Sequence, residues 1–222
     1  MLIGQNKSLF IYSVTRDLGF APNPFHGFCT LATCKPDVRK KAMVGDWVMG
    51  IGGSTMKHQK RKCIFLMEVS NKMTFDEYWN NPEYQLKKAV RNGSKVQVLG
   101  DNIYHTSENG EWHQEDSHHS NADGTINKAN LNRDTGKTNS VLISDNFFYF
   151  GLNAAAIDLD VIGHGRNVRN YQGYSLSNTK PVFKEISEFI KKHANDKNIL
   201  QGDPVDFHLF DKRVDQVTRQ YS

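Results

Sequence analysis

Short apolar runs, rich in β-branched and aromatic residues, limit the folds that this sequence can adopt. The clearest lie at residues 8–15 (SLFIYSVT), 62–71 (KCIFLMEVSN) and 140–151 (SVLISDNFFYFG). Each fits a buried strand and falls far short of the roughly 18 apolar residues that a transmembrane helix requires. A further run at residues 45–53 (GDWVMGIGG) ends at paired glycines, and a short polar loop joins it to residues 62–71. This spacing predicts an antiparallel pair of strands.

Helical patterns are fewer than strand patterns. Thr74 precedes Glu77 by three positions, which is the spacing of a capping box, so we predict a short helix that stops before Pro82. Apolar residues recur at helical spacing within residues 182–196 (VFKEISEFIKKHAND), which predicts an amphipathic helix. The sequence therefore favours an α+β fold: a small, curled, mostly antiparallel sheet or barrel with a few short helices and a C-terminal amphipathic helix.

The length of 222 residues suffices for a core of its own, so we expect a single domain over residues 1–222. A polar segment at residues 99–138 has no sustained apolar period, and loops of this length are usually functional or disordered. The three cysteines are an odd number, which argues against a disulfide framework and for a reducing cytoplasm. The first residues lack the pattern of a secretion signal. We expect a cytoplasmic protein with no membrane segment.

Positive charge is concentrated in the first part of the chain. Residues 1–100 carry 15 Lys and Arg against 7 Asp and Glu, whereas the whole chain has a net charge of +4. The excess gathers at residues 35–41 (KPDVRKK) and 57–62 (KHQKRK). Such clusters attract nucleic acid, because neutralising phosphates releases counterions; the alternative is a solvated helix face and a solvated loop. We predict that Arg39, Lys60 and Arg61 contact phosphate.

Common catalytic and nucleotide-binding motifs are absent from the sequence. It contains no GxxxxGK[ST], no GxGxxG before a long helix and no GxSxG, which excludes P-loop, dinucleotide-binding and common serine hydrolase sites. In a second glycine-rich segment, GHGRNVRNY, Arg166 and Arg169 stand three positions apart. A guanidinium group binds phosphate in a bidentate way, so these two arginines are further candidates for phosphate binding; an exposed loop without a ligand is the alternative.

The segment FAPNPF places Asn23 between two prolines, which fixes a rigid, non-helical backbone. Together with Phe25 and the phenylalanines around it, Asn23 would offer one amide on an apolar platform. An amide can pair with a base edge while aromatic rings stack on the base. The alternative is an ordinary proline-rich turn at the end of a barrel.

Two glycine–aspartate turns supply further candidates. Asp46 and Trp47 stand at the start of a predicted strand, where nearby glycines allow a ligand to approach the backbone, although a tryptophan on a strand is more often part of the core. Asp101, Asn102 and Tyr104 begin the long polar segment, and functional residues are often found in loops.

Histidines and cysteines give weaker indications. Five metal-ligating residue types fall within a short stretch of the polar segment: His113, Glu115, Asp116, His118 and His119. Their spacing matches no known zinc arrangement, so we assign no metal and no cofactor. Cys29, Cys34 and Cys63 do not form a CxxC pair, and free cysteines are usually small buried hydrophobic residues.

Five ordered blocks of the sequence are similar to a known family. The blocks FAPNPFHGFCTLATCKP, GDWVMGIGG, MTFDEYWNNP, GDNIYH and VLISDNFFYFG resemble the nucleotide modification associated domain family, specifically the second domain of that name, from about Ser8 to Gly163. That family occurs in bacterial and phage gene neighbourhoods linked to DNA base modification and its restriction. The block order also resembles PUA-type barrels such as the EVE, ASCH and YTH groups, in which a pocket reads a modified or flipped base.

The first functional hypothesis follows from this resemblance and from the basic clusters. It is a nucleic-acid-associated protein that recognises a modified base or nucleotide in an aromatic-walled pocket, as part of DNA modification or phage defence. Asn23, Phe25, Trp47, Asn102 and Tyr104 would bind the base. Stacking and pairing would offset the few kcal/mol that base extrusion costs.

Two alternatives stay open. One is an enzyme that acts on modified nucleotides or bases, glycosylase-like or metal-assisted, with Asp46 or Asp101 as general base. The other is an interaction protein of a modification or defence complex, in which the helix from Val182 to His193 would dock a partner protein.

Overall fold

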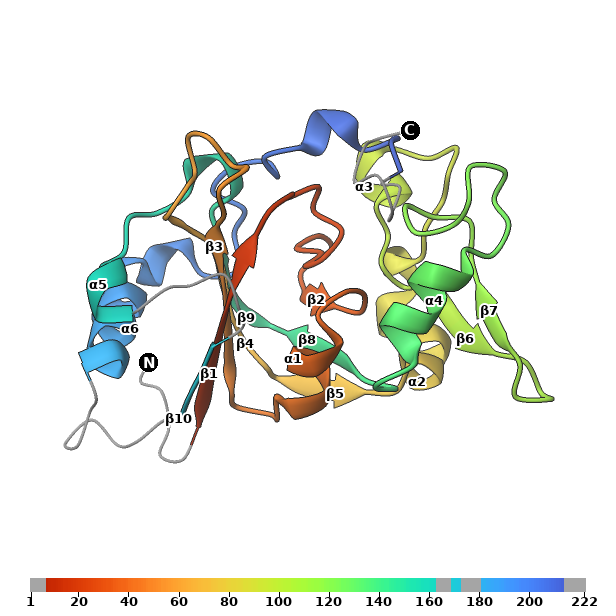
Figure 1. The fold of residues 1–222 in the computed structure, drawn as a ribbon, viewed down its shortest axis with the longest axis horizontal. Coiled ribbons are helices and arrows are strands. Elements are labelled where there is room, and N and C mark those ends of the chain that lie inside the picture. Colours follow the sequence, from red (N-terminus) through yellow and green to blue (C-terminus); the bar gives the residue numbers. More distant parts are fainter. Residues whose placement is uncertain (1–6, 163–168, 173–180, 214–222) are drawn as a thin grey trace. The chain divides into compact units, whose positions relative to one another are not determined.

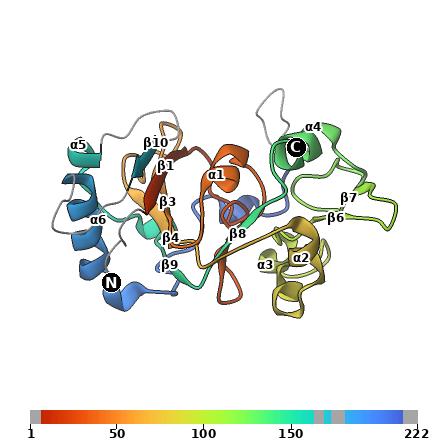
Figure 2. The same cartoon turned by 90° about the horizontal axis from the view of Figure 1, so that it is seen from below.

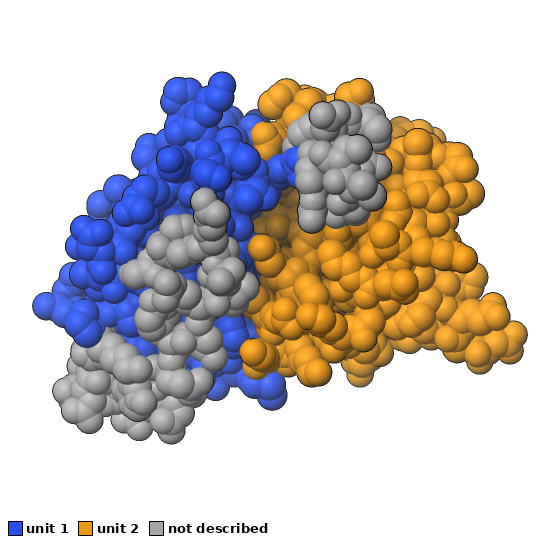
Figure 3. Space-filling view, viewed as in Figure 1, with its two compact units in different colours: residues 1–17, 42–71, 144–205 blue, residues 18–41, 72–143, 206–222 orange. Residues whose placement is uncertain are grey.

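The computed structural model describes residues 7–162, 169–172 and 181–213. The chain packs as two compact units, each assembled from three separate segments (Figure 3). Unit 1 contains Met1–Asp17, Ala42–Asn71 and Ser144–Val205, and unit 2 contains Leu18–Lys41, Lys72–Ile143 and Asp206–Ser222. The expectation of a single domain therefore stays a prediction, and each unit is described by itself.

Unit 1 is built on a five-stranded sheet in the order β10-β1-β3-β4-β9 (Figure 1). Its strands are β1 (Ser8–Val14), β3 (Trp47–Gly52), β4 (Cys63–Glu68), β9 (Asn146–Tyr149) and β10 (Arg169–Gln172). β1 and β3 pair in parallel, and the remaining neighbours pair antiparallel, including the predicted pair β3 and β4. In the described strands the sheet has two edges, β10 and β9, so it is an open sheet. The mostly antiparallel α+β fold is confirmed.

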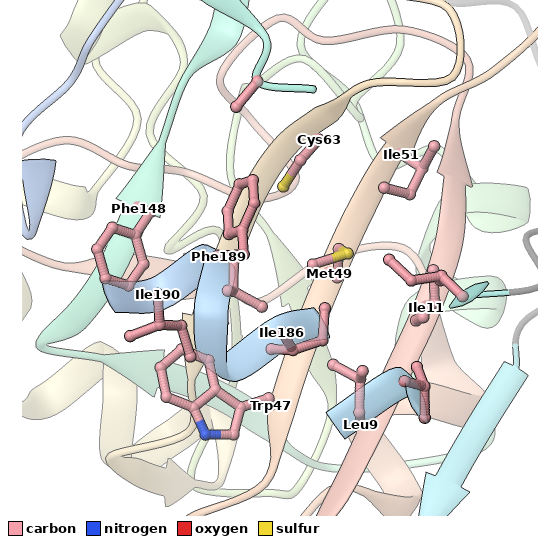
Figure 4. Packing of buried hydrophobic residues seen from close by; sticks show 14 of the residues in the cluster. Leu9, Ile11, Trp47, Met49, Ile51, Cys63, Phe148, Ile186, Phe189 and Ile190 are labelled. Carbon is pink, nitrogen blue, oxygen red and sulfur yellow. The ribbon is translucent and has the colours of Figure 1, made fainter. Parts of the chain in front are cut away.

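The amphipathic helix predicted near the C-terminus is α6 (Pro181–Lys192), and α5 (Leu159–Ile162) lies beside it. On β3, Trp47 and Met49 point to the same face because successive side chains of a strand alternate. Ile186, Phe189 and Ile190 of α6 belong to the same buried cluster as these strand residues (Figure 4). The apolar side of α6 is thus used to cover the sheet and build the core of unit 1.

Unit 2 combines short strands with short helices. A three-stranded sheet has the order β2-β8-β5 (Figure 1). β6 pairs antiparallel with β7 in a hairpin (Figure 2). The elements are β2 (Cys29–Leu31), β5 (Asn71–Met73), β6 (Tyr104–Thr106), β7 (Trp112–Gln114), β8 (Val141–Ser144), α1 (Pro36–Lys41), α2 (Phe75–Asn80), α3 (Lys95–Val98) and α4 (Lys128–Thr135). Unit 2 also contains the 3₁₀ helices η1 (Pro82–Lys87) and η5 (Phe207–Leu209), whereas η2 (Gly151–Asn153) and η4 (Ala194–Asp196) belong to unit 1.

The capping box at the start of α2 is present as predicted. The Glu77 amide donates to Thr74 Oγ1 at 3.2 Å, and the Thr74 amide donates to Glu77 Oε2 at 2.7 Å. These two bonds satisfy backbone donors that have no partner inside the helix. The helix ends at Asn80, before Pro82, again as the sequence indicates.

The segment 99–138, which we expected to be a long polar loop, contains β6, β7 and α4. Its order comes largely from polar side chains that are buried and hydrogen-bonded, such as Gln114, Asn130 and Asp134. Patterns of apolar periodicity detect only elements that bury an apolar face, which explains why we did not predict β6, β7 and α4.

Candidate functional site

The basic cluster at residues 57–62 lies in the connection between β3 and β4 of unit 1, which we call the basic hairpin (Figure 1). Its charged side chains are exposed, whereas Gln59 and Met56 are buried. The exposed residues are Lys57, His58, Lys60, Arg61 and Lys62. The charged side chains of the loop are thus exposed to solvent, whereas the uncharged side chains of Met56 and Gln59 are buried.

The backbone of the basic hairpin is held in place from both ends. The Gly52 amide donates to the Lys62 carbonyl at 2.9 Å, and the Arg61 amide donates back to the Gly52 carbonyl at 2.8 Å. Gln59 Nε2 donates to the Leu152 carbonyl at 3.1 Å. A side chain at Gly52 is excluded, because a Cβ there would lie 2.1 Å from the Gln59 carbonyl oxygen. The loop is therefore anchored to the sheet.

The charges of the basic hairpin are not neutralised within the part of the chain that the structure describes. None of Lys57, Lys60, Arg61 and Lys62 forms an ion pair there, although acidic residues pair with other cations, as Glu188 does with Lys184. Lys60 and Arg61, which we predicted to contact phosphate, lie in this surface together with Lys57 and Lys62.

Three predicted site residues lie together in unit 2: two that we expected to bind the base, Asn23 and Asn102, and one that we expected to be a general base, Asp101. Asn23, Asp101 and Asn102 are each at most 1% exposed. Asp101 accepts hydrogen bonds from Thr30 Oγ1 at 2.6 Å and from the Tyr78 hydroxyl at 2.9 Å. We call these residues, with Lys87, the buried polar network.

Lys87 occupies the centre of the buried polar network. Its Nζ donates to the carbonyl and the side-chain oxygen of Asn23, at 3.0 and 2.8 Å, and to the Phe28 carbonyl at 2.7 Å. Burial lowers the pKa of Lys87 to about 8, although the charge of Asp101 opposes this shift. Burial likewise raises the pKa of Asp101, and the charge of Lys87 opposes it. The amide of Asn23 is thus engaged: its nitrogen donates to the Leu99 carbonyl at 2.9 Å.

Asn102 differs from Asn23 in one respect. Its amide nitrogen donates to the Tyr78 carbonyl at 3.0 Å, but its side-chain oxygen is buried and has no hydrogen-bond partner among the described residues. Phe25, also predicted to bind the base, is buried with its ring centroid 5.7 Å from that of Phe207.

Other predicted residues have structural partners elsewhere. Asp46 belongs to unit 1, where its carboxylate accepts from the amides of Ser8 at 2.7 Å and Met43 at 2.9 Å, and Trp47 is 1% exposed in the core of the same unit. Arg169 lies in β10. Arg166 is outside the described residues.

Arg39 is fully buried in unit 2, although we predicted that it contacts phosphate. All three of its nitrogen groups donate to backbone carbonyls: those of Cys34 at 2.8 Å, Ser140 at 2.7 Å and Asp134 at 2.5 Å. Its neighbours Lys40 and Lys41 are exposed. We therefore do not include Arg39 in the basic surface.

A group that the sequence analysis did not single out lies close to Arg39. Cys34 Sγ is 3.9 Å from His119 Nε2, and His119 Nδ1 is 2.8 Å from Asp134 Oδ2. Arg133 Nε donates to Asp134 Oδ1 at 2.9 Å. The three residues Cys34, His119 and Asp134 are far apart in sequence, so no spacing rule could pair them; the only signal was that His119 belongs to the histidine-rich stretch.

Cys34, His119 and Asp134 shift one another's pKa values. Burial opposes the charged form of each partner, but the charges and hydrogen bonds of the others outweigh it. Thus His119 lowers the pKa of the Cys34 thiol, Asp134 raises the pKa of the His119 imidazole, and His119 with Arg133 lowers the pKa of Asp134. The arrangement thus stabilises the charged forms of Cys34, His119 and Asp134 relative to their neutral forms, against the effect of burial.

The other histidines of the polar stretch have hydrogen-bond or stacking partners of their own. His118 Nδ1 lies 2.6 Å from the Lys212 carbonyl, and burial lowers its pKa to about 3. Glu115 pairs with His105 at 2.8 Å, and the rings of His105 and His113 stack. Asp116 pairs with Arg213. Within residues 7–162, 169–172 and 181–213, no group of three or more such side chains is arranged to hold a metal ion.

Comparisons with known proteins give one result. A family model described as nucleotide modification associated domain 2 matches residues 6–211. No curated protein and no solved structure matches the chain. In the described part of the chain, every helix is too short or too polar to cross a membrane.

Proposed function

Because the chain belongs to the nucleotide modification associated domain 2 family, we propose that it acts in nucleotide modification by binding nucleic acid, with the basic hairpin in contact with the phosphate backbone. The family membership associates it with nucleotide modification. The observation that carries the binding proposal is the anchored, exposed hairpin with four permanent cations, Lys57, Lys60, Arg61 and Lys62.

Phosphate binding by such a loop follows from general electrostatics. A cation that neutralises a phosphate releases condensed counterions, which favours binding at low salt and does not depend on base sequence. The hydrogen bonds to Gly52 and Leu152 hold the loop before binding, so less conformational entropy is lost when the complex forms. Backbone contacts of this kind position a protein on nucleic acid without reading its sequence.

Recognition of a modified base is the second function that we propose, and the side chain of Asn102 supports it. A buried amide oxygen without a partner costs about 1–3 kcal/mol, and a base that donates a hydrogen bond would remove that cost. Asn23, Phe25 and Tyr104 lie in the same unit. The link to phage defence and the presence of partner proteins stay predictions.

Titration of a fluorescein-labelled duplex, followed by anisotropy, tests both functions. We expect binding at about 50 mM salt that weakens steeply as salt increases. Duplexes with cytosine and with 5-hydroxymethylcytosine form the matched pair: tighter binding of the modified duplex supports base recognition, and equal affinity contradicts it. Absence of binding to either duplex at low salt would contradict the proposed function itself.

A further inference from the structure

Cys34 has an unusual backbone that only its surroundings explain. It lies between β2 and α1, and its φ of 56° falls in the left-handed region, as does the φ of 41° at Lys35. Residues other than glycine adopt this region only with backbone strain, and such strain gathers at functional sites. Here the Cys34 amide donates to Asp134 Oδ1 at 2.9 Å, and its carbonyl accepts from Arg39. Both bonds hold the backbone of Cys34 in this conformation.

His119 is oriented by its carboxylate partner. Because Nδ1 lies 2.8 Å from Asp134 Oδ2, this nitrogen carries a proton toward the carboxylate. Nε2 then lies 3.9 Å from the sulfur of Cys34 and 3.3 Å from Nη2 of Arg133. Distances in sites without substrate are often longer than in the working complex. Tyr104 also donates to Asp134 Oδ2, at 2.9 Å, so the carboxylate itself is held.

The thiol of Cys34 differs from the other two cysteines of the chain. Cys34 is partly exposed, whereas Cys29 and Cys63 are buried. Cys63 Sγ donates to the Phe65 carbonyl, and burial raises its pKa far above the ordinary value. Of the three cysteines, Cys34 is the one that is partly exposed as a residue and has an imidazole nitrogen 3.9 Å from its sulfur.

Unused polar groups lie next to the same group. Thr33 Oγ1 and Asn130 Oδ1 are buried and have no hydrogen-bond partner among the residues that the structure describes. Thr33 directly precedes Cys34, and the Asn130 amide nitrogen donates to the His119 carbonyl at 2.7 Å. Since buried polar atoms are nearly always paired, two unpaired oxygens so close to Cys34 and His119 are unusual.

From this geometry we propose that Cys34, His119 and Asp134 form a covalent catalytic site for acyl transfer, with a carboxylic ester or amide carried by a nucleotide as substrate. Cys34 is the nucleophile and His119 is the acid and base. Asp134 and Arg39 are positioning residues, because they act through His119 and the Cys34 backbone. The nucleotide part of the substrate rests on the proposed function, whereas the nucleophile does not.

The reaction balances with water as the only other reactant. The Cys34 thiolate attacks the acyl carbon and forms a C–S bond; the C–O or C–N bond of the substrate then breaks, and the leaving group takes the proton from His119 Nε2. Neutral His119 next takes a proton from water, which attacks the thioester carbon. The C–S bond breaks, the carboxylic acid leaves, and the thiolate beside imidazolium is restored.

The pH dependence of the first step follows from the groups around the sulfur. His119, Arg133, Lys35 and Arg39 are the cations near Cys34, and Asp134 and Tyr104 are the acidic groups. The pKa of Cys34 lies below its ordinary value, so its reaction with an acyl donor should persist at pH values where an ordinary thiol is protonated. Without His119, the pH at the midpoint of the Cys34 reaction should rise toward the pH at which an ordinary cysteine loses its proton.

The test uses p-nitrophenyl acetate as acyl donor and the full chain. We expect a burst of p-nitrophenolate with acetyl on the Cys34 peptide by mass spectrometry, no burst in Cys34→Ser, and an unchanged burst in Cys29→Ala. In His119→Gln, the rate of Cys34 acetylation at pH 7 should fall by about 100-fold, and the midpoint of the pH profile of this rate should shift to higher pH. Acetyl absent from Cys34, or a pH profile unaffected by His119→Gln, would overturn the catalytic site.

Two further measurements separate the parts of the proposal. Release of acetate from an oligonucleotide that contains N4-acetylcytosine supports a nucleotide-linked substrate; acylation by p-nitrophenyl acetate with no release from the oligonucleotide overturns that substrate class. Thermal unfolding and duplex binding of each variant show that it is folded. A protein that is acylated at Cys34 but binds no duplex contradicts the proposed function and leaves the nucleophile intact.

Discussion

Replacing Arg39 with methionine is expected to lower the free energy of unfolding by about 4 kcal/mol. Methionine fills the space of the apolar stem but donates no hydrogen bond, so the carbonyls of Cys34, Ser140 and Asp134 lose a buried donor. Each buried acceptor left without a partner costs about 1–3 kcal/mol. Urea unfolding followed by circular dichroism measures the change.

Lys41→Met is the matched control for this prediction. It removes the same kind of charge from the same helix α1, but Lys41 is exposed, so the free energy of unfolding should change by no more than about 0.5 kcal/mol. Equal effects of the two substitutions would mean that the buried guanidinium contributes nothing through its three hydrogen bonds. Because Arg39 binds both Cys34 and Asp134, the acylation rate of Cys34 should also fall in any folded fraction of Arg39→Met.

Removal of four charges from the basic hairpin is expected to have the largest effect on binding. In the variant with Lys57, Lys60, Arg61 and Lys62 changed to glutamine, the slope of log affinity against log salt should decrease in magnitude by about 3.6, at about 0.9 per phosphate contact. The same relation makes the loss of affinity at 50 mM salt at least about 100-fold. Anisotropy titrations over a salt series measure both quantities.

The control for the hairpin variant changes four exposed lysines of the same unit to glutamine. Lys184, Lys191 and Lys192 lie on α6, and Lys197 follows it. The net charge changes by the same amount, so an effect of overall charge alone would weaken binding equally in both variants. Equal losses would therefore contradict a specific role of the basic hairpin.

The parts of the fold that bury an apolar face could be predicted from the sequence. β1, β3 and β4 follow from apolar runs, α2 from its capping box, and α6 from its helical periodicity. The parallel pairing of β1 with β3 could not be predicted, because no local pattern encodes which distant strands become neighbours. The elements β6, β7 and α4 were missed because polar hydrogen bonds, rather than apolar contacts, hold much of their surroundings.

The candidate sites show the same division. A run of charges within six positions predicted the basic hairpin, since exposure is the ordinary state of lysine. The same reasoning led us to expect an exposed Arg39, which is buried. A six-residue helix is too short for its sequence pattern to show that Val38 and Arg39 face inward while Lys40 and Lys41 face outward. Cys34, His119 and Asp134 meet only after folding, so the sequence offered no spacing by which to group them.

Mapping of photocrosslinks tests most directly the claim that the basic hairpin contacts nucleic acid. A duplex with a diazirine on its phosphate backbone would be irradiated with the wild-type protein, and the crosslinked peptides identified by mass spectrometry. We expect the crosslinked nucleotide to be attached to the peptide that contains residues 57–62. We also expect this crosslink to disappear at high salt. Crosslinks confined to other peptides, such as those from α6, with residues 57–62 unlabelled would contradict the account.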